Sequence, residues 1–216
     1  MNENIIEAKY NITKKSKLEV FYNKYKLLIY IVPSIFLILT FCLLFYGNVN
    51  EKKKIKLAEN YFEAKLYIQN NENEKANDIL KDIIFANDNT YSTLALFLVI
   101  NENLVKDKTE LSNLFDHVLE NNNFKDEMKN LILFKRALIK SSFENELEML
   151  KAINPLTKSD NVWKPHALLL MGDYFFSKNE FVKSKEFYTQ ILLLKNIQES
   201  FYYEANSRLA LIENEK

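Results

Sequence analysis

The sequence predicts an all-α protein in which an N-terminal transmembrane helix precedes a domain of helical hairpins. Residues 27–46 carry no charge, and apolar residues recur at helical spacing through most of the chain that follows. Among 216 residues only 2 are Gly and 3 are Pro, which leaves few turn residues for a many-stranded sheet. We therefore expect a basic tail at 1–26, a transmembrane helix at 27–46, a joint at 47–50 and a helical domain at 51–216.

The segment from Leu27 to Tyr46 is long and apolar enough to cross a membrane. Fourteen of its 20 residues are Leu, Ile, Val or Phe, and about 20 helical residues span the hydrocarbon core. A buried core helix is one alternative, but such a helix is seldom apolar on every face for 20 residues. A cleaved signal peptide is the other, but no small-residue cleavage pattern follows Tyr46. Charge leaves the orientation open, because four lysines stand near each end: Lys15, Lys17, Lys24 and Lys26 against Lys52, Lys53, Lys54 and Lys56.

Helical periodicity continues almost to the C-terminus, interrupted by short polar joints. Helices are expected near 51–70, 74–86, 90–104, 108–120, 124–141, 144–153, 162–178, 181–195 and 199–213. The joints contain Asn-rich stretches and the pair Asn154-Pro155, which favour helix ends. Short joints between amphipathic helices imply antiparallel neighbours.

One spacing occurs twice in the helical domain. The same intervals of 3, 9, 4 and 3 residues separate Ala64, Tyr67, Ala76, Leu80 and Ile83, and then Gly172, Phe175, Ser184, Tyr188 and Ile191. Small residues where two helices cross, with bulky residues one turn away, are typical of the tetratricopeptide repeat. The distance between the two copies leaves room for two further units, so we predict about four hairpins and a capping helix. The alternative is an ordinary helical bundle in which this spacing is accidental.

The layout resembles the YfgM-type ancillary subunits of the Sec translocon, in particular their alphaproteobacterial relatives. The likeness lies in residues 60–80, in residues 130–140 with the Arg136-Ala137 pair, and in residues 155–192. It implies a bacterial inner-membrane protein with a cytoplasmic N-terminus and a periplasmic helical domain. It also implies that the partners are the Sec channel, a periplasmic chaperone and translocating chains.

Residue types that carry catalysis or bind cofactors are sparse. Gly47 and Gly172 are too far apart for a phosphate-binding loop, and Cys42 alone excludes a disulfide framework. His117 and His166 lack the spacing of a helical metal site. Residues 57–216 carry a net charge of about −6, which disfavours nucleic acid as a partner. We therefore expect no catalytic residue, no cofactor, no metal and no small-molecule substrate.

Binding to another protein is the function that this pattern favours. Stacked hairpins present a continuous surface built from the first helix of each unit. The residues expected on that surface are Tyr61, Lys65, Ile68, Gln69, His166, Leu169, Asp173, Phe176 and Ser177. For Leu169 and Phe176, packing between units is an equally good interpretation.

We therefore expect a membrane-anchored, non-enzymatic adaptor that assists protein export beside the Sec translocon. The alternative is an envelope scaffold for cell division or cell-wall assembly that associates with itself through its repeats.

Overall fold

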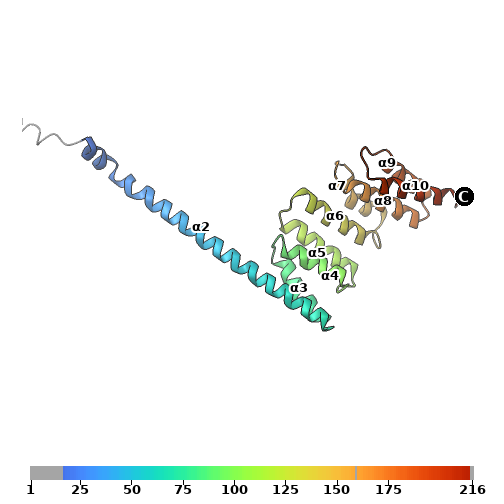
Figure 1. The fold of residues 1–216 in the computed structure, drawn as a ribbon, viewed down its shortest axis with the longest axis horizontal. Coiled ribbons are helices and arrows are strands. Elements are labelled where there is room, and N and C mark those ends of the chain that lie inside the picture. Colours follow the sequence, from blue (N-terminus) through green and yellow to red (C-terminus); the bar gives the residue numbers. More distant parts are fainter. Residues whose placement is uncertain (1–16, 159, 215–216) are drawn as a thin grey trace, which may run out of the picture. The chain divides into compact units, whose positions relative to one another are not determined.

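The computed structural model describes residues 17–158 and 160–214, and this part of the chain is helical without any strand. The all-α prediction is therefore confirmed for the described residues; residues 1–16 of the expected basic tail lie outside them. The helices, labelled in Figure 1, are α2 (Lys17–Gln69), α3 (Asn73–Phe85), α4 (Tyr91–Asn101), α5 (Lys108–Asn121), α6 (Asp126–Lys140), α7 (Glu146–Lys158), α8 (Lys164–Ser177), α9 (Phe181–Leu192) and α10 (Glu199–Asn214).

The chain divides into two compact units, Met1–Ile55 and Lys56–Lys216. The first unit contains the apolar part of α2. There the segment Val20–Cys42 is long and apolar enough to cross a membrane by its length and composition. Its large side chains face outward, with Phe36 66% and Leu37 68% exposed. A helix that is apolar on all sides and has no protein packed around it is typical of a membrane span.

Polar groups inside the apolar segment form hydrogen bonds within the helix itself. The hydroxyl of Ser34 donates to the carbonyl of Tyr30 at 2.8 Å, and that of Thr40 donates to the carbonyl of Leu37 at 2.9 Å. Pro33 lies within α2 and supplies no backbone N–H. Such local bonds allow a membrane helix to carry hydroxyl groups without unpaired donors in lipid.

The joint expected at 47–50 is helical, and the helix expected at 51–70 is the end of the longer helix α2. A single glycine costs a helix about 1 kcal/mol relative to alanine. That cost at Gly47 is too small to end a helix of this length, because each further residue adds a backbone hydrogen bond once the helix has formed.

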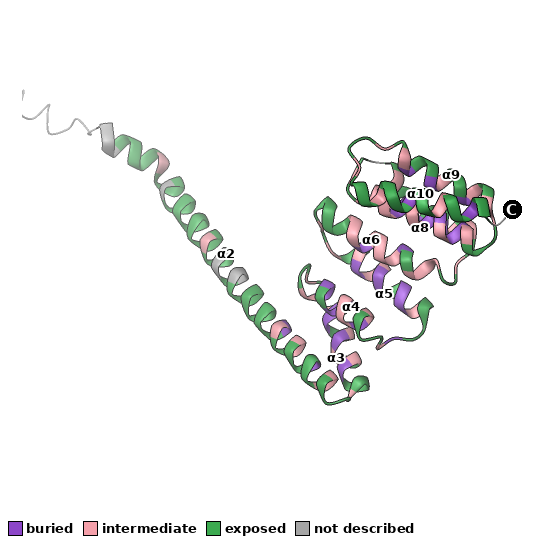
Figure 2. Ribbon diagram, turned by 45° about the vertical axis from the view of Figure 1, so that its right-hand side comes forward, coloured by how far each residue is buried: buried purple, intermediate pink, exposed green. Residues whose placement is uncertain are grey.

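The second unit has its core in three adjoining clusters of buried side chains. The first cluster joins the end of α2 to α3, α4 and α5, and includes Ala64, Leu80 and Phe115. The second joins α6, α7 and α8 through residues such as Met149, and the third joins α8, α9 and α10 through residues such as Tyr188. Figure 2 shows the buried residues on the faces that helices α3 to α10 turn toward one another. A core divided along the chain in this way is typical of stacked helical units.

The Asn154-Pro155 pair does not end a helix, because α7 continues through it to Lys158. Proline removes one helical hydrogen bond and costs about 3 kcal/mol or more in a helix interior. The additional turn places Leu156 in the second cluster, where the side chain is fully buried. Burial of a leucine contributes about 1.5–3 kcal/mol and offsets much of that cost.

Helices α8 and α9 approach most closely at Gly172. The hydroxyl of Ser184 donates to the Gly172 carbonyl at 2.8 Å, and both residues are buried. The ring of the fully buried Tyr188 lies against the same glycine, so that a Cβ at position 172 would overlap the Cε1 and Cδ1 atoms of that ring. The absence of a side chain at Gly172 is therefore what lets Tyr188 pack on the α8 backbone.

Each successive pair of helices carries a buried small residue in both members. The two pairs with the repeated spacing are Ala64 with Ala76 and Gly172 with Ser184, and the pairs between them are Ala95 with Ser112 and Ala137 with Ala152. Of the bulky residues in the repeated spacing, Leu80, Ile83, Phe175, Tyr188 and Ile191 are buried, and Tyr67 is half-buried. In the two middle pairs, more residues of sequence separate the two small residues, because longer connections join α4 to α5 and α6 to α7.

We expect Gly172→Ala to lower the free energy of unfolding by up to about 2 kcal/mol. Overpacking against Tyr188 costs about 1–3 kcal/mol, and the better helix propensity of alanine recovers about 1 kcal/mol. Thermal or denaturant unfolding of the full chain in detergent, followed by circular dichroism, measures the change. In a Tyr188→Leu background the ring is gone, and the same substitution should then be neutral or stabilising. Equal losses in both backgrounds would show that the ring does not limit the size of residue 172.

Candidate functional site

The residues expected to bind a partner on the first hairpin divide into two pairs. Tyr61 and Ile68 are half-buried and pack against the first cluster, and burial raises the pKa of Tyr61. Lys65 and Gln69 are exposed. The apolar members of this predicted surface therefore contribute to the core rather than projecting freely.

The expected binding residues on α8 also contact their own domain. Leu169 and Phe176 are half-buried and pack against the third cluster, and Phe176 makes an edge-to-face contact with Phe181 at 5.5 Å between ring centroids. Ser177 is exposed, and its hydroxyl donates to the carbonyl of Tyr174 at 2.7 Å. Of the two interpretations of Leu169 and Phe176, the structure favours packing.

Asp173 joins three helices instead of facing a partner. The hydroxyl of Tyr188 on α9 donates to its Oδ1 at 2.6 Å, and Nε of Arg208 on α10 forms an ion pair with the same oxygen at 3.1 Å. Burial raises the pKa of the Tyr188 hydroxyl, and the hydrogen bond to Asp173 raises it further. This carboxylate therefore stabilises the α8–α9–α10 arrangement.

An aromatic pocket lies between the connection from α7 to α8 and the connection from α9 to α10. It has a volume of about 640 Å³ and is lined by residues 160–166, residues 193–198 and Phe201. Trp163 and His166 lie 5.0 Å apart between ring centroids, and Phe201 lies 4.6 Å from His166. Phe134 stacks against Trp163 at 5.5 Å and supports it from the second cluster. The rings thus form a continuous series from the second cluster to Phe201, which packs against the third.

Local hydrogen bonds fix the first wall of the aromatic pocket. The side-chain amide of Asn161 donates to the carbonyl of Leu156 at 2.9 Å, and its oxygen accepts from the backbone N–H of Trp163 at 2.8 Å. These bonds tie the end of α7 to the start of α8, where Pro165 occupies the first turn. Trp163 is held at the helix start, and His166 follows three residues later on the same face.

The remaining wall comes from the connection between α9 and α10. Asn196 has a φ of 54°, a left-handed conformation that asparagine tolerates better than most residues. Leu194 and Ile197 on either side of this turn pack against the third cluster. Val162 and Leu193 stand at the pocket rim with 70% and 76% of their surfaces exposed.

The imidazole of His166 is oriented by the backbone. Its Nδ1 lies 3.2 Å from the carbonyl oxygen of Val162. A carbonyl only accepts hydrogen bonds, so Nδ1 carries the proton and Nε2 is left as the nitrogen that can bind a ligand. The pocket thus combines aromatic surface with polar groups from His166 and from lining residues such as Lys164 and Lys195, a combination suited to binding a ligand.

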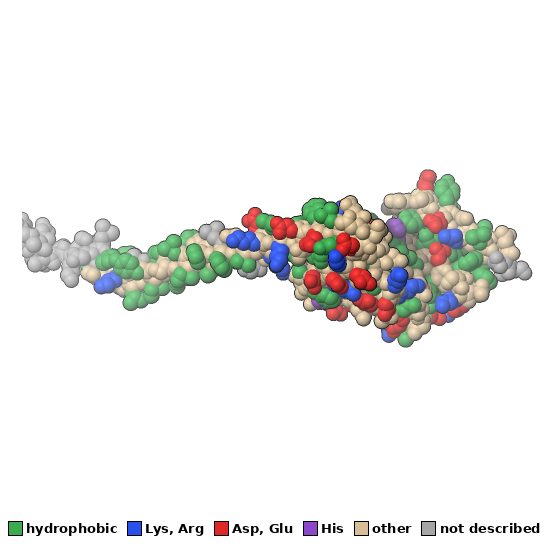
Figure 3. Space-filling model, turned by 90° about the horizontal axis from the view of Figure 1, so that it is seen from below, with side chains coloured by type: hydrophobic (Ala, Val, Ile, Leu, Met, Phe, Trp, Pro, Cys, Tyr) green, Lys and Arg blue, Asp and Glu red, His purple; other side chains and the backbone are tan. Residues whose placement is uncertain are grey.

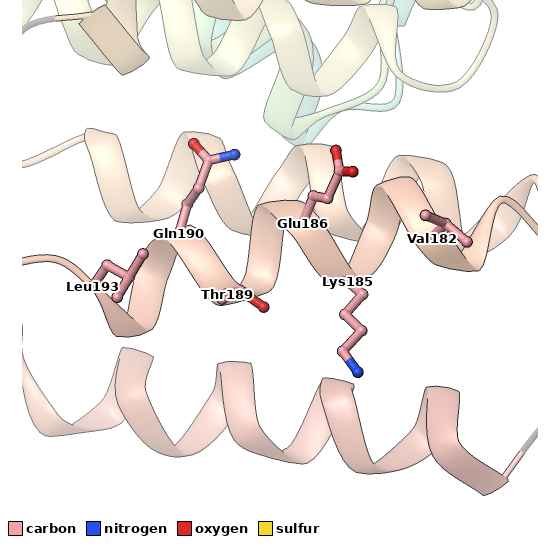
Figure 4. Close-up of a pocket in the computed structure, with 6 residues that line it drawn as sticks. All are labelled: Val182, Lys185, Glu186, Thr189, Gln190 and Leu193. Atoms are coloured by element: carbon pink, nitrogen blue, oxygen red, sulfur yellow. The ribbon is translucent and has the colours of Figure 1, made fainter.

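A second, shallower surface lies on the outer face of α9, as Figure 4 shows. Its volume is about 550 Å³, and all of its lining residues come from α9 or directly follow it. Glu186 and Gln190 point to one side of the helix and Lys185 to the other. The surface is an open helix face rather than an enclosed pocket; Leu193 also lines the aromatic pocket and connects the two.

Sequence reasoning did not identify Trp163, Phe201, Val162 or Leu193 as site residues. The interval of three between Trp163 and His166 is visible in the sequence and places both on one helical face. Phe201 lies 35 residues beyond His166, and only the fold brings the two rings together.

Among the residues that the structure describes, no three His, Cys, Asp or Glu side chains gather in a way that could hold a metal ion. Cys42 lies exposed in the apolar part of α2. His117 contacts the Asn87 side chain at 2.8 Å and the ring of Phe85 at 4.6 Å, which gives it a structural role between α3 and α5.

Comparison with known protein families, with characterised proteins and with solved structures finds no match to this chain. The site is therefore interpreted from its own geometry.

The raised pKa of Tyr188 predicts how stability changes at alkaline pH. An unfolded tyrosine loses its proton near pH 10, whereas folded Tyr188 holds its proton to higher pH. The Tyr188 hydroxyl therefore makes its full contribution to the free energy of unfolding below pH 10, and this contribution is lost as the pH rises above 10. The wild-type protein should lose stability more steeply above pH 10 than Tyr188→Phe, by up to about 1.4 kcal/mol per pH unit. Denaturant unfolding at a series of pH values measures both slopes, and parallel slopes would contradict the expectation.

Proposed function

We propose that this protein is a membrane-anchored, non-enzymatic adaptor that binds a polypeptide segment in its aromatic pocket. The observation that carries the proposal is the group of Trp163, His166 and Phe201 beside the exposed Val162 and Leu193. Aromatic surface with a polar tip is enriched where proteins bind one another.

The charges around the aromatic pocket suit part of a polypeptide chain. A volume of about 640 Å³ has room for several apolar side chains. Lys164 and Lys195 lie on the rim together with Asp160, so the apolar floor is surrounded by both signs of charge. A partner chain would place apolar side chains on the rings and hold its polar backbone at this rim.

Membrane anchoring through residues 27–46 is the second part of the proposal. Support comes from the apolar, outward-facing segment of α2 and from the hydroxyl groups that bond within it. Anchoring holds the pocket near the bilayer, where the local concentration of membrane-associated partners is high.

Protein export is the process that we propose for the adaptor, with the Sec channel, a periplasmic chaperone or translocating chains as partners. The support is the likeness of residues 60–80, 130–140 and 155–192 to ancillary translocon subunits. In that arrangement the N-terminus is cytoplasmic and the helical domain lies in the periplasm of a bacterial inner membrane. Emerging chains expose apolar segments, which are the ligands that an aromatic pocket favours.

Self-association as an envelope scaffold is the second candidate. Val182 on α9 and Leu193 directly after it are both 76% exposed, and a matching face on another copy would cover them. Light scattering of the full chain in detergent distinguishes the candidates, since a stable oligomer without other proteins favours the scaffold.

Peptide binding is testable through Trp163, because it is the only tryptophan of the chain and lines the pocket. We expect a short peptide with a central Leu-Phe-Leu to change the Trp163 emission in a saturable way. The same peptide with Ser-Ser-Ser at its centre should have no effect. Val162→Asp should weaken binding about tenfold, because it replaces an apolar contact worth roughly 1.5 kcal/mol with a charge.

Val182→Asp is the matched control, since Val182 is as exposed as Val162 but lies outside the aromatic pocket. It should leave peptide affinity unchanged. Unchanged emission with the apolar peptide, or an equal loss in both variants, would count against the pocket as the binding site.

The export assignment predicts where the helical domain lies and what it contacts. In cells stripped of their outer membrane, added protease should digest residues 56–216, whereas intact cells should protect them. A photo-crosslinking residue at position 162 should capture a Sec subunit, a periplasmic chaperone or an exported chain. Protection of the domain in the stripped cells would place it in the cytoplasm and exclude this assignment.

A further inference from the structure

The charges that flank the apolar part of α2 are placed at a spacing that matches a bilayer. No charged residue occurs between Lys26 and Glu51, and the whole interval is helical. At about 1.5 Å per residue, Lys26 and Lys52 are about 39 Å apart along the helix axis. A bilayer is about 40–45 Å thick when its headgroup layers are included. A helix that spans the membrane therefore places one group of lysines in each headgroup layer.

Lysines mark both ends of this interval. Lys24 and Lys26 stand at one end, and Lys52, Lys53 and Lys54 stand at the other; all five side chains are exposed. Figure 3 shows the hydrophobic surface of this segment with basic side chains at each of its ends. Within the described part of the chain, neither Lys52 nor Lys54 forms an ion pair with a carboxylate.

The arrangement of the lysines suits a layer of anions rather than one bound anion. Successive helical residues are rotated by about 100°, so Lys52, Lys53 and Lys54 fan over about 200° of the helix surface. They cannot converge on a single phosphate, but each can reach a different headgroup. Val49, which lies on the membrane side of these three lysines, is 51% exposed and provides apolar surface for the acyl boundary.

We propose that Lys52, Lys53 and Lys54, together with Lys24 and Lys26, bind the phosphate groups of anionic phospholipids. The protein thereby gathers such lipids around its anchor. Each lysine near an anionic membrane surface strengthens attraction about fivefold, so three together strengthen it by about a hundredfold. This inference rests on the membrane anchor of the proposed function but not on the aromatic pocket.

Native mass spectrometry of the full chain in a neutral detergent tests the inference. The protein is titrated with phosphatidylglycerol or with phosphatidylcholine, which share a phosphate but differ in net charge. We expect phosphatidylglycerol to be retained at least about tenfold more strongly than phosphatidylcholine. The triple variant Lys52→Gln, Lys53→Gln, Lys54→Gln should lose most of this preference, and added salt should weaken it in the wild type.

The triple variant Lys106→Gln, Lys125→Gln, Lys129→Gln is the matched control, because it removes the same charge from exposed positions on the helical domain. It should keep the wild-type preference. Displacement of phosphatidylglycerol by inorganic phosphate would instead indicate a site for free anions and overturn the lipid assignment. Equal retention of both lipids by the wild type would also overturn it.

Extraction of cell membranes with alkaline carbonate separates this inference from the proposed function. A protein released by carbonate is not anchored, and both proposals then fail. A protein that stays in the membrane but shows no lipid preference keeps its anchor, and only the lipid inference is lost.

Discussion

The close approach of paired helices at small side chains is the constraint on which the helical domain depends. At Gly172 the backbone of α8 admits the ring of Tyr188, and this contact brings α9 near enough for Ser184 to bond to the same residue. Tyr188 in turn bonds to Asp173, which pairs with Arg208 on α10. The position of α10 brings Phe201 to His166. The aromatic pocket is thus a consequence of a crossing that lies away from it.

Asparagine explains why the helix boundaries were readable from the sequence. All five described non-glycine residues with positive φ are asparagines, and each stands in a connection between helices: Asn71, Asn87, Asn103, Asn179 and Asn196. Left-handed positions that usually need glycine are here held by a side chain that can bond to nearby backbone groups. A chain with only 2 glycines can therefore still make tight turns, and its Asn-rich joints predict most helix ends to within a few residues.

The sequence was less informative where a helix-breaking residue is outweighed by its surroundings, which are the long helix α2 in one case and tertiary contacts in the other. Gly47 and Pro155 are helix breakers by propensity, yet both lie within helices. The cost of Pro155 within α7 is offset by the burial of Leu156 one residue later. That burial depends on the neighbouring helix, so a local sequence pattern does not predict it. The same limit applies to the site. Leu169 and Phe176 could be placed on the correct helix, but whether they faced solvent or α9 depended on how α8, α9 and α10 pack.

A fold that depends on residue size at a few crossings leaves most of its surface unconstrained. Solvent-facing positions can then vary without loss of the helical stack. Specific binding on such a scaffold requires side chains that are not committed to the crossings. Leu169 and Phe176 pack against the third cluster, and Asp173 is committed to α9 and α10. Val162 and Leu193 take no part in a helix crossing. Both are exposed beside the rings of Trp163, His166 and Phe201. The aromatic pocket is therefore a better candidate for partner binding than the face of α8.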